Sequence, residues 1–117
     1  MTNHNKFDLE DRTLNFSKDL IQFCKSIPDN QINRRLIDQV IRSGTSVGAN
    51  YREANDALGK KDFVLRLKIS RKEAKETIYW LELLDSDNPK LRIKIDYLLK
   101  EATELKNILS SIINKSV

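Results

Sequence analysis

Residues 42–54, RSGTSVGANYREA, decide how the chain is interpreted, because they place two of its three glycines inside a pattern that otherwise predicts a helix. Each glycine inside a helix costs about 1 kcal/mol relative to alanine. The segment is therefore either a glycine-rich loop that binds phosphate or a helix with one thin face. These two alternatives lead to different functions.

A phosphate-binding loop follows a strand, precedes a helix, and carries Lys and Ser/Thr at fixed offsets or a GxGxxG spacing. Residues 42–54 show none of these features. Gly44 and Gly48 are one helical turn apart, among the small residues Ser43, Thr45, Ser46 and Ala49. We therefore predict that Gly44 and Gly48 let a neighbouring helix approach closely, with a ligand-binding loop as the alternative.

The rest of the chain shows the same helical periodicity. Apolar residues recur at steps of three and four nearly throughout, and only three glycines and two prolines interrupt them. The pattern predicts an all-α protein, an antiparallel up-and-down four-helix bundle in a single domain covering residues 1–117. The predicted helices are about 9–26, 31–58, 61–85 and 89–115.

Local signals set the predicted helix ends. Pro28 ends the first helix, Asn30 caps the second and Gly59 stops it, and Asn88 with Pro89 starts the fourth. In the first helix the predicted core stripe is Leu14, Ile21, Cys24 and Ile27. In the second it runs from Leu36 to Leu58.

Additional apolar residues widen the faces of the last three predicted helices. If several of them stay exposed, the apolar patch exceeds what soluble monomers usually tolerate, so we expect a homo-oligomer. These residues are Ile37, Ile41, Leu65, Ile69, Tyr79, Trp80, Leu83, Leu99, Ile108 and Ile113.

The single cysteine and histidine favour a reduced, non-secreted protein. Cys24 lies among apolar residues and is expected to be a buried thiol, while His4 lies near the N-terminus, away from the predicted helices. The opening residues lack an apolar leader, and no segment approaches the roughly 18 apolar residues of a membrane helix. We expect a cytoplasmic protein with no membrane partner.

A basic segment suggests an anionic partner. Residues 60–75 contain seven basic and two acidic residues, a net charge of +5, against +4 for the whole chain. The basic residues lie largely off the apolar stripe, where they could bind nucleic-acid phosphates. They are Lys60, Lys61, Arg66, Lys68, Arg71, Lys72 and Lys75. The alternative is a solvated face with i,i+4 pairs such as Lys72 with Glu76.

A polar cluster is the only candidate for catalysis. Asn50 and Glu53 lie near Arg42, and Glu53 could face Glu76 across the second and third helices. A di-metal helical bundle, however, requires Glu-x-x-His pairs, and the only histidine is at position 4. We expect no enzyme, no cofactor and no metal. Asn50 and Glu53 are instead predicted to form a buried cluster that fixes helix register or subunit contacts.

Two segments resemble a known family. QVIRSGTSVGANYRE at residues 39–53 and DFVLRLKISRKEAKETIYWLELL at residues 62–84 are similar to the small four-helix bundle proteins named after the intervening sequences of bacterial 23S rRNA genes. The residues that fit the common family pattern are Arg42, Ser46, Asn50 and Glu53. Those that depart from it are Val47, Gly48, Tyr51, Arg52 and Ala54. The segment around Glu76, Tyr79 and Trp80 resembles one branch of the family.

The resemblance implies a homopentamer of bundles around a central channel. It also implies similarity to the accessory variability determinant of diversity-generating retroelements, a basic pentamer that works with a reverse transcriptase and nucleic acid. Two hypotheses stay open. One is a non-enzymatic oligomer that binds structured RNA or RNA–DNA hybrid with little sequence preference. The other is an adaptor that recruits a partner protein such as a reverse transcriptase.

Overall fold

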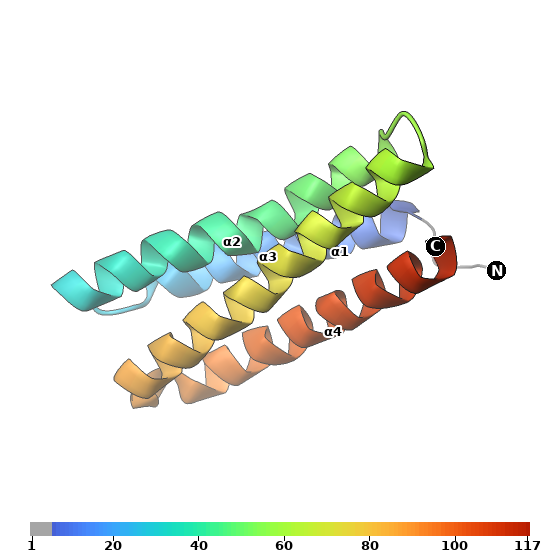
Figure 1. Ribbon diagram of the computed structural model, residues 1–117. Helices are drawn as coiled ribbons and strands as arrows, with labels where there is room; N and C mark the ends of the chain where they lie inside the picture. Colours follow the sequence, from blue (N-terminus) through green and yellow to red (C-terminus); the bar gives the residue numbers. More distant parts are fainter. Residues whose placement is uncertain (1–5) are drawn as a thin grey trace.

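The protein folds into four long helices. A computed structural model describes residues 6–117, and the side chains from Asp8 onward. The helices are α1 (Lys6–Lys25), α2 (Gln31–Asn55), α3 (Lys60–Asp87) and α4 (Arg92–Ser116), with a short 3₁₀ turn, η1 (Pro89–Leu91), before α4 (Figure 1). The prediction of an all-α four-helix bundle is confirmed. His4 lies outside the described residues.

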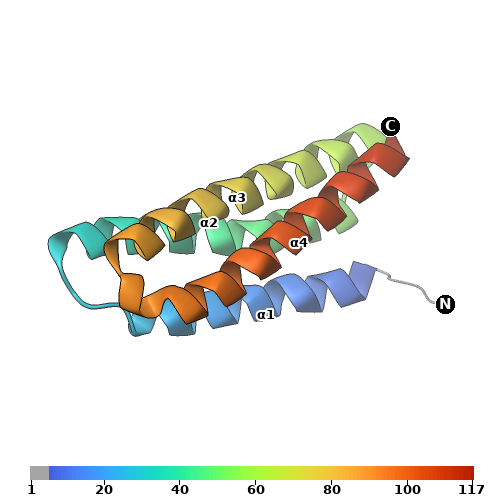
Figure 2. The same cartoon turned by 90° about the horizontal axis from the view of Figure 1, so that it is seen from below.

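Consecutive helices run antiparallel. The α1–α2 and α3–α4 connections lie at one end of the bundle, and the α2–α3 connection lies at the other, beside the end of α4 (Figures 1 and 2). The bundle measures 44 × 27 × 19 Å. Packing is most extensive between α2 and α3 and between α3 and α4, whereas α1 packs mainly on α2. The two central helices of the sequence therefore form the best-packed part of the molecule.

A side-chain cap marks the start of α2, whereas η1 starts at Pro89 and the predicted cap residue Asn88 makes no side-chain capping bond there. The Asn30 side chain accepts a hydrogen bond from the backbone N–H of Asn33 at 2.8 Å, so the predicted cap is confirmed. Pro89 occupies the first turn after Asn88, as predicted, but this turn is the 3₁₀ turn η1. The α-helical part of α4 consequently begins at Arg92.

The end of α2 differs from the prediction. The helix ends at Asn55, and the backbone N–H of Asp56 bonds to the carbonyls of Arg52 and Glu53. Asn and Asp compete with the helix for backbone hydrogen bonds, which explains the early end. Leu58 is fully exposed, contrary to its predicted place in the core stripe. Gly59 does not stop α2; it precedes α3 as the N-cap residue, in extended backbone.

The core face of α1 differs from the prediction in part, since Cys24 and Ile27 are buried as predicted but two other predicted residues are not. Leu14 and Ile21 remain 39% and 37% exposed, whereas Phe16, Leu20 and Phe23 are buried. Both sets have helical spacing, so periodicity alone did not separate them. The set with two phenylalanines buries more apolar area, which favours its side of the helix as the core face.

The thin face of α2 packs against α1. A Cβ atom at Gly44 would overlap Cδ2 of Leu20, and one at Gly48 would lie 2.9 Å from Oγ1 and 3.0 Å from Cβ of Thr13. Leu20 and Thr13 are both fully buried, so neither has free space to move into. The helix is continuous through residues 42–54, which excludes a ligand-binding loop there.

Small hydroxyl side chains line the contact between α2 and α3. Thr77 Oγ1 donates to Ser43 Oγ at 2.8 Å, and Ser70 Oγ donates to the carbonyl of Val47 at 2.7 Å. Ser43, Ser70 and Thr77 are fully buried. Because buried polar groups are costly unless hydrogen-bonded, these two bonds fix both the register and the rotation of α3 on α2.

Two asparagine side chains hydrogen-bond to each other at the end of the bundle where the α1–α2 and α3–α4 connections lie. Asn33 and Asn88 exchange two hydrogen bonds of 3.0 Å, and Asn33 Nδ2 also donates to the carbonyl of Pro28 at 2.9 Å. Asn33 is fully buried, and each of its amide hydrogens has an acceptor. This pair ties the start of α2 to the end of α3.

An arginine fork joins α1 to α4. Arg12 donates two bonds of 2.8 Å to Glu101 and one of 2.9 Å to Glu104. Hydrogen bonding to Glu101 is the main cause that raises the pKa of Arg12, so the guanidinium stays charged. The bridge compensates for the otherwise limited packing between these two helices.

The close contact of α2 with α1 predicts a specific sensitivity to side-chain size. Gly48→Leu should destabilise the bundle by about 2 kcal/mol through overpacking against Thr13, lowering Tm by roughly 8 °C. Gly59→Ser is the control, because a Cβ at Gly59 meets no atom within 4 Å and serine is a good N-cap. Thermal unfolding followed by circular dichroism measures both. A Gly48→Leu protein with unchanged Tm would contradict the packing argument.

Candidate nucleic-acid interface

The exposed face of α3 follows from its core face. Leu67, Ala74 and Leu81 are buried against the other helices, so side chains half a turn away face solvent. Steps of four and three residues along that side connect six exposed residues, which we call the outer stripe. The outer stripe consists of Lys61, Leu65, Lys68, Lys72, Lys75 and Tyr79.

Four lysines thus lie in one line along α3. At 1.5 Å per residue, Lys61 and Tyr79 are about 27 Å apart along the helix axis. Lys68, Lys72 and Lys75 follow one another at about one helical turn, so their ammonium groups form a continuous positive edge. A flexible polyanion could contact several of them at once.

Two arginines form ion pairs with the acidic residues of α3 that could otherwise have neutralised these lysines. Asp62 pairs with Arg66 at 3.6 Å, and Glu73 and Glu76 both pair with Arg42 of α2. The Lys72–Glu76 pair, which the alternative of a solvated face would contain, is therefore not formed. Within residues 8–117 no ion pair reaches any lysine of α3, which leaves Lys60, Lys61, Lys68, Lys72 and Lys75 open to an anion.

The two arginines of the predicted basic site lie away from the outer stripe. Arg66 is partly buried in its pair with Asp62. Arg71 is half-buried and its Nη1 donates to Ser110 Oγ of α4 at 3.4 Å. Of the seven predicted residues, the structure therefore brings four lysines together in the outer stripe, leaves Lys60 exposed at the start of α3, and directs Arg66 and Arg71 elsewhere.

Arg42 organises the polar edge between α2 and α3. Its Nη1 lies 3.3 Å from Glu73 Oε1, and its Nη2 bonds to Glu76 Oε1. Trp80 Nε1 donates to the same Glu76 oxygen at 3.3 Å. The Tyr79 and Trp80 rings meet edge to face, with centroids 5.1 Å apart and planes at 69°. The chain of contacts from Arg42 therefore supports Tyr79 from one side.

The expected cluster of Asn50 and Glu53 is not formed within one chain. Glu53 is exposed, and Asn50 Nδ2 bonds to the carbonyl of Ser46 in its own helix at 2.9 Å. Glu76 takes Arg42 as its partner, not Glu53. Opposite charge explains this choice, since two facing carboxylates repel unless a cation lies between them.

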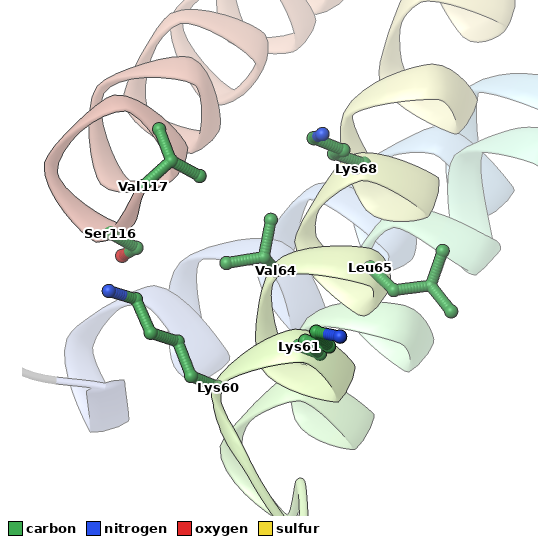
Figure 3. A pocket seen from close by; sticks show the side chains of 7 residues that line it. All are labelled: Lys60, Lys61, Val64, Leu65, Lys68, Ser116 and Val117. Atoms are coloured by element: carbon green, nitrogen blue, oxygen red, sulfur yellow. The ribbon is translucent and has the colours of Figure 1, made fainter.

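A hollow opens where the outer stripe meets the end of α4. Its volume is about 320 Å³, and its lining is mostly apolar. Lys60 and Lys68 extend toward the end of α4, and Val64 lies between them (Figure 3). The residues that line it are Lys60, Lys61, Val64, Leu65, Lys68, Ser116 and Val117. We call it the α3–α4 hollow; it combines an apolar floor with a rim of amines.

Three further features concern metal ligands, membrane spans and the single cysteine in the part of the chain that is described. No group of three or more His, Cys, Asp and Glu residues there is placed to hold a metal ion. No helix among residues 6–117 is both long and apolar enough to span a bilayer. Cys24 is buried, and burial raises the pKa of its thiol to about 11.

The spacing of the outer stripe is present in the sequence, but of its members the predicted basic site contains only the lysines and not Leu65 or Tyr79. The sequence predicts both Tyr79 and Trp80 for helix packing or a subunit interface; in the structure Trp80 is half-buried and Tyr79 is 55% exposed. Counting back from Tyr79 in steps of four and three leads through Lys75, Lys72 and Lys68. Its position in line with these lysines distinguishes Tyr79 from apolar residues such as Trp80 that lie beside the core.

The fold and this surface define a class of protein: a small antiparallel helical bundle with a lysine-rich outer face on its third helix. Residues 5–111 match the family model described as 23S rRNA-intervening sequence protein, and the chain belongs to this family. The resemblance seen in the sequence is thereby confirmed.

A solved structure shows the same architecture. It is the crystal structure of a protein with unknown function from the S23 ribosomal protein family of Bacteroides thetaiotaomicron VPI-5482. The two chains are 37% identical, with a TM-score of 0.85 over 93% of this chain and 97% of that one. A search of curated proteins finds no match.

The buried thiol predicts a pH dependence of stability. Its pKa is raised from 9.0 to about 11 by burial. The unfolded thiol therefore ionises first, and the free energy of unfolding should fall as pH rises from 9 toward 11. Urea unfolding across this range measures the slope. Cys24→Ala should remove the thiol's share of it; an identical slope in both proteins would contradict the assignment.

Proposed function

We propose that the protein binds nucleic acid, without catalysing a reaction, through the lysines of the outer stripe. The observation that carries the proposal is a row of four lysines at helical spacing, none in an ion pair with a described residue. The family name refers to intervening sequences of 23S rRNA, which supports RNA as the partner. Structured RNA and RNA–DNA hybrid are the first candidates.

Lysine chemistry determines the expected mode of binding. An ammonium group on a flexible stem neutralises a phosphate as a point charge and releases a counterion, but it reads no base edge by itself. Binding should therefore depend steeply on salt and only weakly on sequence. Phosphate contacts of this kind position a nucleic acid without specifying it.

A homo-oligomer is the second part of the proposal, with the pentamer implied by the family resemblance as its expected form. Ile93 of α4 is 87% exposed, beside the exposed ring of Tyr97. Both line a hollow of about 410 Å³ between α4 and the α1 residues Asp19, Gln22 and Phe23. Apolar side chains exposed around a hollow are typical of subunit contacts.

The adaptor alternative also has an observation in its favour. Leu65 and Tyr79 are more than half exposed within the outer stripe, and an apolar pair on a helix face can anchor a partner protein. Such a partner would use the lysines for steering only. Salt dependence separates the two functions, because an apolar contact survives salt that removes phosphate binding.

Charge reversal on the outer stripe tests the proposal. Lys68→Glu, Lys72→Glu and Lys75→Glu together should weaken RNA binding by about 100-fold and reduce the salt slope by about three. Anisotropy of labelled structured RNA between about 50 and 200 mM salt measures both quantities. Arg71 is left unchanged because it contacts α4.

The matched control reverses three exposed lysines outside α3 that do not line the hollow beside Ile93: Lys18→Glu, Lys90→Glu and Lys100→Glu. Both triple variants change the net charge equally, so a nonspecific charge effect would weaken binding equally in both. Equal loss in the two variants, or full binding by the outer-stripe variant, would overturn the site.

Light scattering of the purified protein tests the oligomer. We expect a mass near five times 13.6 kDa and a smaller mass for Ile93→Glu, because a charge at a buried apolar contact is costly. A wild-type mass of one chain at micromolar concentration would contradict the proposal. Circular dichroism of Ile93→Glu checks that the bundle itself still folds, as the exposure of Ile93 leads us to expect.

A further inference from the structure

Tyr79 has an environment unlike that of a packing residue. Its ring is 55% exposed at the end of the line of lysines, and one side of it is held by Trp80. Trp80 is fixed by Glu76, which in turn is held by Arg42. An exposed aromatic ring in a fixed position loses little entropy on binding and offers a flat apolar surface.

The neighbours of Tyr79 suit a nucleotide. Lys75 and Lys72 precede it by four and seven residues, which places them about 6 and 10 Å away along the helix axis. A base stacked on Tyr79 would therefore have its flanking phosphates beside ammonium groups. Aromatic stacking together with a positive track is the usual way in which proteins hold single strands.

Stacking on Tyr79 requires an unpaired base. The bases of a duplex already stack on one another, and a side chain on the convex surface of a helix reaches them only by unstacking a step. An unpaired segment presents its bases at no such cost. A stripe that ends in Tyr79 would thus discriminate between strands by their pairing, although lysines alone would not.

The α3–α4 hollow provides a second apolar surface at the other end of the stripe. Val64 of α3 and Val117 of α4 line it from opposite sides, and Lys60 and Lys68 extend toward the end of α4 (Figure 3). A base lying in the hollow would have amines within reach of its phosphate. Beyond Tyr79 the positive line ends, because the exposed residue one turn further is Glu82.

We propose that the outer stripe binds a single-stranded segment of nucleic acid, which runs from the α3–α4 hollow to Tyr79 and stacks one base on the Tyr79 ring. This inference rests on the proposed function and specifies its ligand as an unpaired strand, such as a loop or overhang of a structured RNA. The track of about 27 Å is long enough for several nucleotides.

Trp80 makes the test direct, because it is the only tryptophan and its ring touches that of Tyr79. The probes are a uridine oligomer of about 12 nucleotides and a blunt RNA duplex with the same number of phosphates, at about 100 mM salt. The full chain should bind the single strand at least about tenfold more tightly than the duplex. Only the single strand should change the Trp80 fluorescence.

Two substitutions separate stacking from apolar area. Tyr79→Leu keeps an apolar side chain but lacks a flat ring, and should lose about tenfold in single-strand affinity together with the fluorescence change. Tyr79→Phe keeps the ring and should retain both. Duplex affinity should be the same in all three proteins, a result that a merely structural role of Tyr79 would not produce.

The failures of the two proposals are distinguishable. Equal affinity for single strand and duplex, or full single-strand affinity in Tyr79→Leu, overturns the unpaired-strand inference. In either case the loss of binding on charge reversal at Lys68, Lys72 and Lys75 would still support the proposed function. Absence of binding to both probes overturns both. The single strand and the duplex are compared with the wild-type protein, so this test does not depend on whether a variant folds.

Discussion

Two glycines and three small hydroxyl residues lie where the neighbouring helices cross α2, and their small size governs how the bundle is assembled. Gly44 and Gly48 let α1 approach, while Ser43 bonds to Thr77 of α3. Ser70 donates to the carbonyl of Val47 on α2, so rotating α3 would bury the Ser70 hydroxyl without this acceptor. The same constraint that packs the core thus directs the opposite side of α3, with its lysines, toward solvent.

The outer stripe stays positive because arginines, and not its lysines, pair with the neighbouring carboxylates. Arg42 contacts two carboxylates of α3, and Arg12 contacts two of α4, as expected of a planar guanidinium with several donors. The lysines of α3 make no such contacts within the described residues. Because Arg42 pairs with both Glu73 and Glu76, the net charge of the basic segment is concentrated in ammonium groups that a ligand can reach.

The sequence predicts correctly those features that depend only on residues close together along the chain. The four helices, the Asn30 cap and the positive segment of α3 all follow from residue spacing along one helix. Other features required partners far apart in the sequence: Glu76 is 34 residues from Arg42, and Asn33 is 55 residues from Asn88. Periodicity was ambiguous on α1, where Leu14 shares the helical spacing of the true core face but lies on the wrong side.

The proposed homo-oligomer and the proposed RNA binding by the outer stripe would depend on each other. Four lysines on one helix can engage only a few phosphates, and at physiological salt such a set holds a strand weakly. Repetition of the outer stripe in an oligomer would let one RNA contact several stripes, with each later contact made at high effective concentration. A change at the Ile93 contact would then weaken RNA binding without touching a lysine, whereas Tyr79 would affect each stripe independently. The surface that joins subunits would therefore control affinity, and the outer stripe would control which strands are bound.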